Sequence, residues 1–300
     1  MASRLATTSR SIWGVLPARN RHTRFPRRVG SAPRSGGNED GQGDLYSRNS
    51  RRMVRARSHS GMDVRTPLPC CPGWTVAHLL GHLGSIYVAV NKYVRDGTGE
   101  DIVNELEDLE LAPEFEEWFR SGSGLEQLPL SVVDWYRESA GNLEETFAAT
   151  DPAQRTWTWL PSNQTAEFWL RRMTHETIIH RWDVETAKGK AQAVGSDLAS
   201  DGVDEALTVY QPRNCRPESK VKGQGETFRF EQTDGPSKWT VRLEEEDMQV
   251  SRDGEPAEVT LRGSGSELML FLWHRIPGGH LAIEGDVSLV ERYFELVPPD

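Results

Sequence analysis

The hydrophobic period of this chain changes from helical to alternating close to Pro212. Before that point apolar residues recur every three or four positions, which is typical of amphipathic helices. After it they recur at every second position in ETFRFEQ, KWTVRLEE, DMQVSRDGE and AEVTLRG, with Asp-Gly turns among them. The change predicts a two-domain α+β protein, in which a helical domain precedes a small α+β domain with an antiparallel sheet.

The helical region, residues 44–212, contains four segments long enough for a bundle. They are a weak first helix, LYSRNSRRMVRAR, then VAHLLGHLGSIYVAVNKYV with Thr75 as N-cap, LSVVDWYRESAGNLEETFAAT and QTAEFWLRRMTHETIIHRWDVETAKG. A shorter helix, SDLASDGVDEALTVY, follows them. These lengths and connections predict an antiparallel four-helix bundle. In the second domain, residues 220–300, the four strands precede a helix SELMLFLWHRI, a strand LAIEGD and a closing helix VSLVERYFELV.

Charge is divided unevenly along the chain. Residues 1–60 hold 13 arginines and 3 acidic residues, whereas the remainder holds 22 basic and 42 acidic residues. We expect residues 1–43 to form a disordered basic tail, because they are rich in Arg, Ser and Gly and lack apolar periodicity. The acidic body argues against nucleic acid as a partner of the folded part, since binding phosphates requires cations.

The origin of the tail has two interpretations. Its composition resembles an organelle transit peptide, or it is an extension upstream of a later start at Met53 or Met62, which we favour. No run of 18 or more apolar residues occurs, which argues against a membrane span. Cys70, Cys71 and Cys215 form no even disulfide framework, so a reducing cytoplasm is the expected compartment.

The segment HETIIHRWD, residues 175–183, begins like the HExxH motif of zinc proteases but has one extra residue before its second histidine. Five helical steps place His175 roughly 140° around from His180, so the two histidines cannot bind one ion. Glu176 and His180 are four residues apart and share one face with apolar residues. A buried carboxylate needs a partner, so this pair predicts either a metal site or a hydrogen-bonded network in the bundle.

A second pair of histidines favours the metal. His78 and His82 are also four residues apart, in TVAHLLGHLG, and lie in another apolar helix. Two histidines, one carboxylate and an open position form a typical ligand set of catalytic zinc. His78 falls in the first helical turn, where an acidic residue normally closes a capping box, so His82 is the better candidate ligand.

Four motifs carry a resemblance to a known family. They are PCCPGWTVAHLLGHLG, HETIIHRWDVETAKG, DGVDEAL and RGSGSELMLFLWHR with LAIEGD, and in this order they resemble the mycothiol-dependent maleylpyruvate isomerase family over about residues 65–296. The resemblance implies a DinB-like four-helix bundle that holds a divalent metal, usually zinc, followed by a domain similar to sterol carrier protein 2. It implies His82, Glu176 and His180 as the metal ligands and mycothiol as the thiol cofactor.

Three more residues lie close to these motifs. Asp183 follows His180 by three positions and is a candidate to orient its ring, although a surface ion pair with Arg181 is the alternative. His78 is a second candidate for such an outer contact, and its position is commonly acidic in the family. Cys71 precedes the metal helix, and we expect its thiol to be packed and inert rather than reactive.

These observations predict a metal-dependent enzyme that uses mycothiol, either an isomerase or an S-transferase, with a small electrophilic substrate. In an isomerase the thiolate adds to a cis double bond, the adduct rotates, and elimination returns the trans isomer. In a transferase the adduct is kept. The alternative is a non-enzymatic protein whose metal is structural and whose C-terminal domain binds a small ligand.

Overall fold

The computed structural model describes residues 63–97, 99–101, 131–214, 221–253 and 255–298. The expected tail 1–43, the expected helix 45–57 and most of the expected acidic loop lie outside this range. The chain divides into two compact units, one built mainly from Trp74–Thr177 and the other from Pro67–Gly73 together with Ile178–Pro299. Within the described residues, no helix is both long and apolar enough to cross a membrane.

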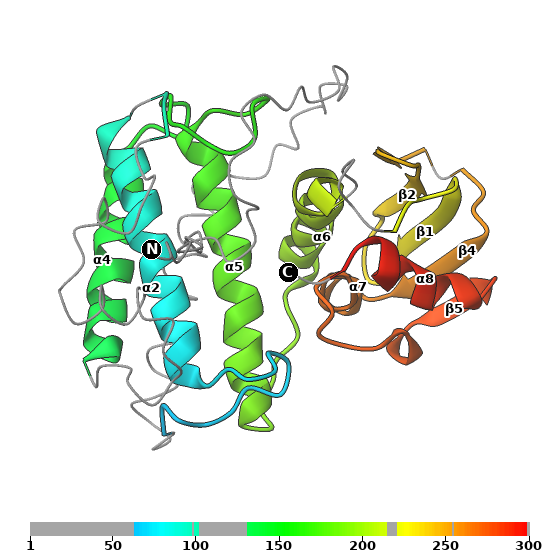
Figure 1. The fold of residues 1–300 in the computed structure, drawn as a ribbon, viewed down its shortest axis with the longest axis horizontal. Coiled ribbons are helices and arrows are strands. Elements are labelled where there is room, and N and C mark those ends of the chain that lie inside the picture. Colours follow the sequence, from blue (N-terminus) through cyan, green and yellow to red (C-terminus); the bar gives the residue numbers. More distant parts are fainter. Residues whose placement is uncertain (1–62, 98, 102–130, 215–220, 254, 299–300) are drawn as a thin grey trace, which may run out of the picture. The chain divides into compact units, whose positions relative to one another are not determined.

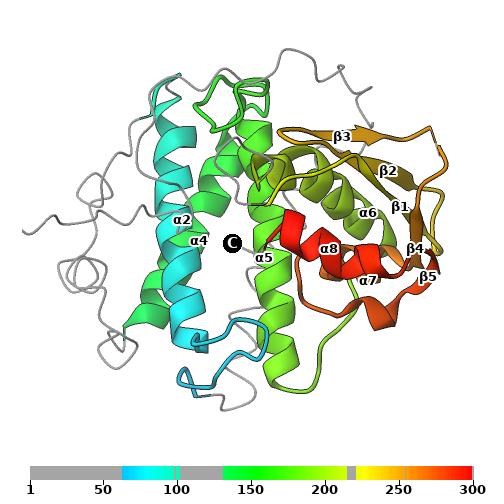
Figure 2. The same cartoon turned by 45° about the vertical axis from the view of Figure 1, so that its right-hand side comes forward.

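Three of the four expected bundle helices are described, and they lie side by side in Figures 1 and 2. They are α2 (Val76–Asp96), α4 (Val132–Ala149) and α5 (Ala166–Ala187). The predicted N-cap of α2, Thr75, is confirmed. The helix ends at Gly97, which has a left-handed backbone (φ 59°) and donates its N–H to the carbonyl of Tyr93.

The direction of α4 differs from the antiparallel arrangement that we expected. A Cβ on Gly84 would meet the Trp135 ring, the Tyr87 ring contacts Tyr136, and Asn91 accepts a hydrogen bond from Thr146. Because these partners advance together along both helices, α2 and α4 run parallel. The connection between them is more than 30 residues long, which is enough to return the chain along the bundle, whereas short connections enforce antiparallel neighbours.

Helix α5 runs antiparallel to α2. His82, near the start of α2, contacts Glu176 in the middle of α5, whereas Tyr93, near the end of α2, stacks on Trp169 in the first turn of α5. The division between the two units falls inside α5, between Thr177 and Ile178, so this one helix belongs to both. Because α5 is one continuous helix, the distances between its residues are those of regular helical turns.

The second unit contains a five-stranded sheet of order β3-β2-β1-β4-β5. Its strands are β1 (Glu226–Gln232), β2 (Lys238–Leu243), β3 (Met248–Ser251), β4 (Val259–Gly263) and β5 (Ala282–Gly285). Three pairings are antiparallel, as expected, but β1 and β4 are parallel. The chain must therefore cross the sheet between β3 and β4, and on this path the carbonyl of Glu255 accepts hydrogen bonds from Thr240 and Arg229.

Helices cover one face of this sheet (Figure 2). They are α6 (Ser196–Glu205), α7 (Gly265–Leu272) and α8 (Ser288–Leu296), and α6 continues into short turns η3 (Ala206–Tyr210) and η4 (Gln211–Asn214). A further turn, η5 (Gly278–His280), precedes β5. The register places Phe230 between Trp239 and Leu261, so large apolar side chains align across the strands and form the core under the helices.

Candidate metal site

His78 closes the first turn of α2. Its Nδ1 accepts a hydrogen bond from the backbone N–H of Thr75 at 3.0 Å, which is the bond that a glutamate or glutamine accepts in a capping box. Burial lowers the pKa of His78 to about 4, so the ring is neutral and keeps the lone pair that this bond requires. The structure therefore gives Nδ1 of His78 a role at the helix start.

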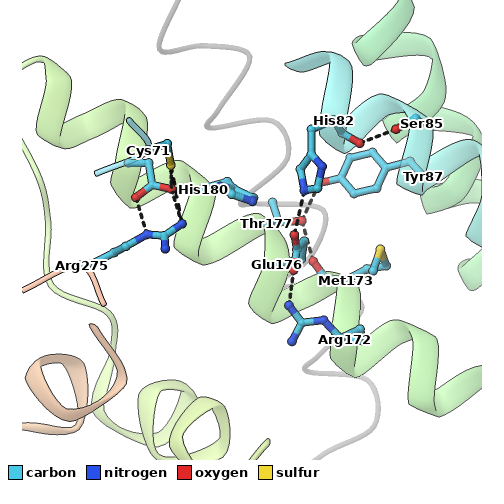
Figure 3. A network of polar contacts seen from close by, with 11 residues as sticks. Cys71, His82, Ser85, Tyr87, Arg172, Met173, Glu176, Thr177, His180 and Arg275 are labelled. Carbon is cyan, nitrogen blue, oxygen red and sulfur yellow. Dashed lines mark hydrogen bonds and ion pairs between the residues drawn. The ribbon is translucent and has the colours of Figure 1, made fainter. Parts of the chain in front are cut away.

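His82 lies one turn further along α2. Its Nε2 is 3.2 Å from Oε1 of Glu176 on α5. The His82 ring is inclined by 66° to the ring of Trp74, with centroids 5.1 Å apart. The second carboxylate oxygen of Glu176, Oε2, forms an ion pair with Arg172, one turn earlier on the same helix (Figure 3).

The three residues that the family resemblance implies as metal ligands form one cluster of possible ligands. A ligand atom from each of His82, Glu176 and His180 lies within 4.8 Å of the other two. Glu176 and His180 come from successive turns of α5, as the four-residue spacing predicts. Among the described residues, His175 belongs to no such cluster, and its side chain is fully buried.

Asp183 fixes the other side of the His180 ring. Its Oδ2 lies 2.9 Å from Nδ1 of His180, and Arg275 binds both of its carboxylate oxygens at 2.9 Å. The burial of Asp183 opposes its ionisation, but the hydrogen bond from His180 and the charge of Arg275 outweigh burial and hold the pKa below its usual range. An ionised Asp183 accepts the Nδ1 proton, so Nε2 of His180 is the ring nitrogen that keeps a lone pair.

A second cluster, formed by Cys71, His180 and Asp183, also has ligand atoms within 4.8 Å of one another. Its chemistry suits a cation less well. Burial and the charge of Asp183 raise the pKa of Cys71 to about 12, so the thiol stays protonated, and it donates to Asp183 at 3.5 Å. Both oxygens of Asp183 already bind the cationic Arg275. The inert thiol expected at Cys71 stays a prediction, which the raised pKa supports, since nucleophiles and metal ligands are thiolates.

Sequence reasoning did not find Arg275. The residue ends the motif RGSGSELMLFLWHR, and its position depends on how α7 terminates. His274 adopts a left-handed backbone (φ 57°), its N–H bonds to the carbonyl of Phe271, and the N–H of Arg275 bonds to the carbonyl of Leu270. These two bonds define a Schellman motif, which usually has glycine at the left-handed position. Because histidine occupies this position instead of glycine, the sequence does not reveal where α7 ends.

Arg172 was also missed, because it lies within an ordinary amphipathic pattern. Its side chain is only 4% exposed, and its only sequence signal is the four-residue spacing to Glu176. Buried arginines almost always have an acidic partner, so an arginine one turn before a buried glutamate is the signal that could have revealed it.

The donor set fits a divalent metal such as zinc. Two tetrahedral ligands at about 2.0–2.1 Å from zinc are about 3.3 Å apart, close to the 3.2 Å between His82 and Glu176. One nitrogen of His180 is oriented by a carboxylate, the usual outer contact of a metal-bound histidine. Two histidines and one carboxylate leave a fourth position for a thiol, a substrate or water.

Comparisons with known proteins match both parts of the chain to one family. A family model described as the mycothiol maleylpyruvate isomerase N-terminal domain matches residues 45–185, and the model of the C-terminal domain of the same family (MDMPI) matches residues 197–292. No curated protein sequence matches the chain.

Two solved structures share the fold. A crystal structure of a mycothiol-dependent maleylpyruvate isomerase covers 84% of this chain and 95% of its own, with 14% identity and a TM-score of 0.58. A histidine-to-alanine mutant of such an isomerase matches over the same shares, with 15% identity and a TM-score of 0.58. With its two domain matches and this shared fold, the chain belongs to the mycothiol-dependent maleylpyruvate isomerase family.

Proposed function

We propose that this protein is a metal-dependent enzyme that uses mycothiol to transform a small electrophilic substrate, and that His82, Glu176 and His180 bind the metal, with zinc as the expected ion. The observation that carries the proposal is the cluster of three ligand atoms within 4.8 Å. Its support is strengthened by Asp183, which holds Nδ1 of His180. A divalent metal at this cluster supplies a Lewis acid that favours ionisation of a thiol at neutral pH.

The residues of the chain have separate tasks in this proposal. Asp183 selects the tautomer of His180 and fixes its ring, and Arg275 keeps Asp183 ionised in a buried setting. Trp74 packs against the ring of His82 and limits its rotation. The family match supports mycothiol as the thiol, and a maleylpyruvate-like substrate is the first to test. Addition followed by elimination makes an isomerase, whereas addition alone makes an S-transferase.

The test measures metal content and turnover together. Purified protein should bind close to one zinc per chain and convert maleylpyruvate only when mycothiol is present. His82→Ala, Glu176→Ala and His180→Ala should each lose the metal on dialysis, because two ligands remain. His175→Ala is the matched control, since it removes a neighbouring buried histidine that lies outside the cluster.

Two results would contradict the proposal. The first is loss of zinc in His175→Ala while Glu176→Ala stays loaded, which would place the ligands on another face of α5. The second is a fully loaded protein that shows neither isomerisation nor thiol adducts with maleylpyruvate or other small electrophiles. That outcome would favour the alternative, a protein whose metal is structural. We also propose a cytoplasmic site of action, because the free thiols of Cys70 and Cys71 suit a reducing compartment.

A further inference from the structure

The carboxylate of Glu176 has a different partner on each oxygen. Oε1 faces Nε2 of His82 at 3.2 Å, and Oε2 forms an ion pair with the guanidinium of Arg172. Arg172 is 4% exposed and Glu176 is 15% exposed, so solvent screens this pair weakly. A buried permanent cation therefore lies against the carboxylate of the cluster (Figure 3).

The order of these two residues along α5 is not the order that best stabilises an exposed helix surface. Acidic and basic residues four apart stabilise an exposed helix best when the acid comes first, whereas here Arg172 precedes Glu176. A guanidinium also stays charged under all physiological conditions, so it cannot leave the site neutral by releasing a proton. Its charge acts on whatever binds Oε1.

We propose that Arg172 is a built-in counter-cation of the metal site, which neutralises Glu176 before the ion binds, restricts the carboxylate to binding through Oε1, and so weakens metal affinity. This inference rests on the proposed function. A divalent ion held by Glu176 would share its negative charge with Arg172 and would be repelled by the guanidinium. The arginine acts through Glu176 and is a positioning residue. A carboxylate shared in this way donates less charge to the ion and leaves it a stronger Lewis acid for the thiol.

Two variants separate the charge of Arg172 from its hydrogen bond. Arg172→Gln keeps a donor for Oε2 but removes the charge, and Arg172→Lys keeps the charge but loses the planar fork. The measurements are the zinc dissociation constant, by competition with a chelating dye, and the melting temperature of the metal-free protein. Arg172→Gln should bind zinc about tenfold more tightly or better and should melt lower without metal, because the buried carboxylate of Glu176 loses the charge of Arg172. Arg172→Lys should bind zinc with an affinity close to that of the unmodified protein.

The same helix offers a matched control. Arg181 and Glu185 are a second buried pair at the same spacing, with Nε 3.7 Å from Oε1 and side chains 7% and 12% exposed. Arg181→Gln should also lower the melting temperature but should change zinc affinity by less than about threefold, since Glu185 is outside the cluster.

Zinc binding by the two proteins distinguishes failure of the counter-cation from failure of the proposed metal site. If the unmodified protein binds zinc and Arg172→Gln binds it equally or more weakly, the counter-cation is refuted and the proposed metal site stands. If zinc binds only to Arg172→Gln, the arginine opposes metal binding as inferred, but the proposed metal-dependent function of the unmodified protein fails. If neither protein binds zinc, both proposals fail.

Discussion

At the scale of single residues, His78 shows that a histidine at the sequence spacing of a metal ligand can have another role. Its spacing to His82 is that of a metal pair, yet its Nδ1 accepts the N–H of Thr75 and completes the start of α2. The family motif and the position in the first turn favoured His82, and the clustering of His82 with Glu176 agrees with that choice. The spacing of residues along one helix was readable from the sequence, whereas the partner of each ring nitrogen was not.

The capping role of His78 can be tested with a variant that keeps the acceptor. His78→Gln should preserve the bond to Thr75, whereas His78→Ala should lose about 0.3–1.5 kcal/mol of unfolding free energy. The folded pKa of His78, about 4, lies below its unfolded value. Its stabilising contribution is therefore complete above the unfolded pKa and is lost as the pH falls toward 4. Denaturant unfolding at pH 7 and pH 5 should show a larger loss for the unmodified protein than for His78→Gln.

Asp183 is the second residue whose role depends on contacts that only the fold provides. Asp183→Asn should weaken zinc binding about 10- to 100-fold, because His180 loses the acceptor that orients it. It should also cost about 3–5 kcal/mol of stability, since Arg275 is left with a buried charge. The double variant Asp183→Asn with Arg275→Met should regain stability but not zinc affinity. Equal recovery of both properties would contradict an orienting role.

At the scale of elements, the sequence predicted nearly every described helix and strand. The alternating pattern of KWTVRL and VTLRG is resolved as β2 and β4, and the apolar run GSELMLFL as α7. The parallel pairing of β1 with β4 was missed, because each strand's own pattern is the same for either direction. The parallel direction of α2 and α4 was missed for a similar reason, since apolar stripes do not record the course of a long connection.

The start of α7 provides a test at this scale. Ser264 and Glu267 form a complete capping box, in which each side chain accepts the backbone N–H of the other. Ser264→Ala should cost about 0.5–2 kcal/mol of unfolding free energy. Ser264→Asp keeps an acceptor and should cost less. Urea unfolding of the three proteins measures the difference, and an unchanged midpoint for Ser264→Ala would argue against the capping role.

At the scale of the whole molecule, α5 contributes residues to both compact units of the chain. The expected domain boundaries, 44–212 and 220–300, stay a prediction, as does the likeness of the second domain to sterol carrier protein 2. The compact units separate inside α5, and Ile178, Ile179 and Trp182 belong to the core that includes the sheet. A domain boundary placed between two elements cannot represent a helix whose residues belong to two compact units.

A truncated protein can test this sharing. A fragment that ends after α5, at residue 190, keeps the cluster of His82, Glu176 and His180 but exposes Ile178, Ile179 and Trp182, each buried in the full chain. Each lost burial costs about 1.5–3 kcal/mol. We expect the fragment to bind a hydrophobic dye and to melt well below the full chain. The control is the same fragment with these three residues changed to Gln, which should bind less dye. A monomeric unmodified fragment with little dye binding would contradict the shared core.

The two outermost strands, β3 and β5, have only four residues each. An exposed strand edge is a template on which a second chain can add its own strand, and such growth leads to fibres and precipitates. Four residues offer few free backbone groups, and β5 ends at Gly285, where the backbone turns with φ 102°. The sheet therefore gives a neighbouring molecule little length to extend, and concentrated solutions of the folded protein should resist self-association through its strands.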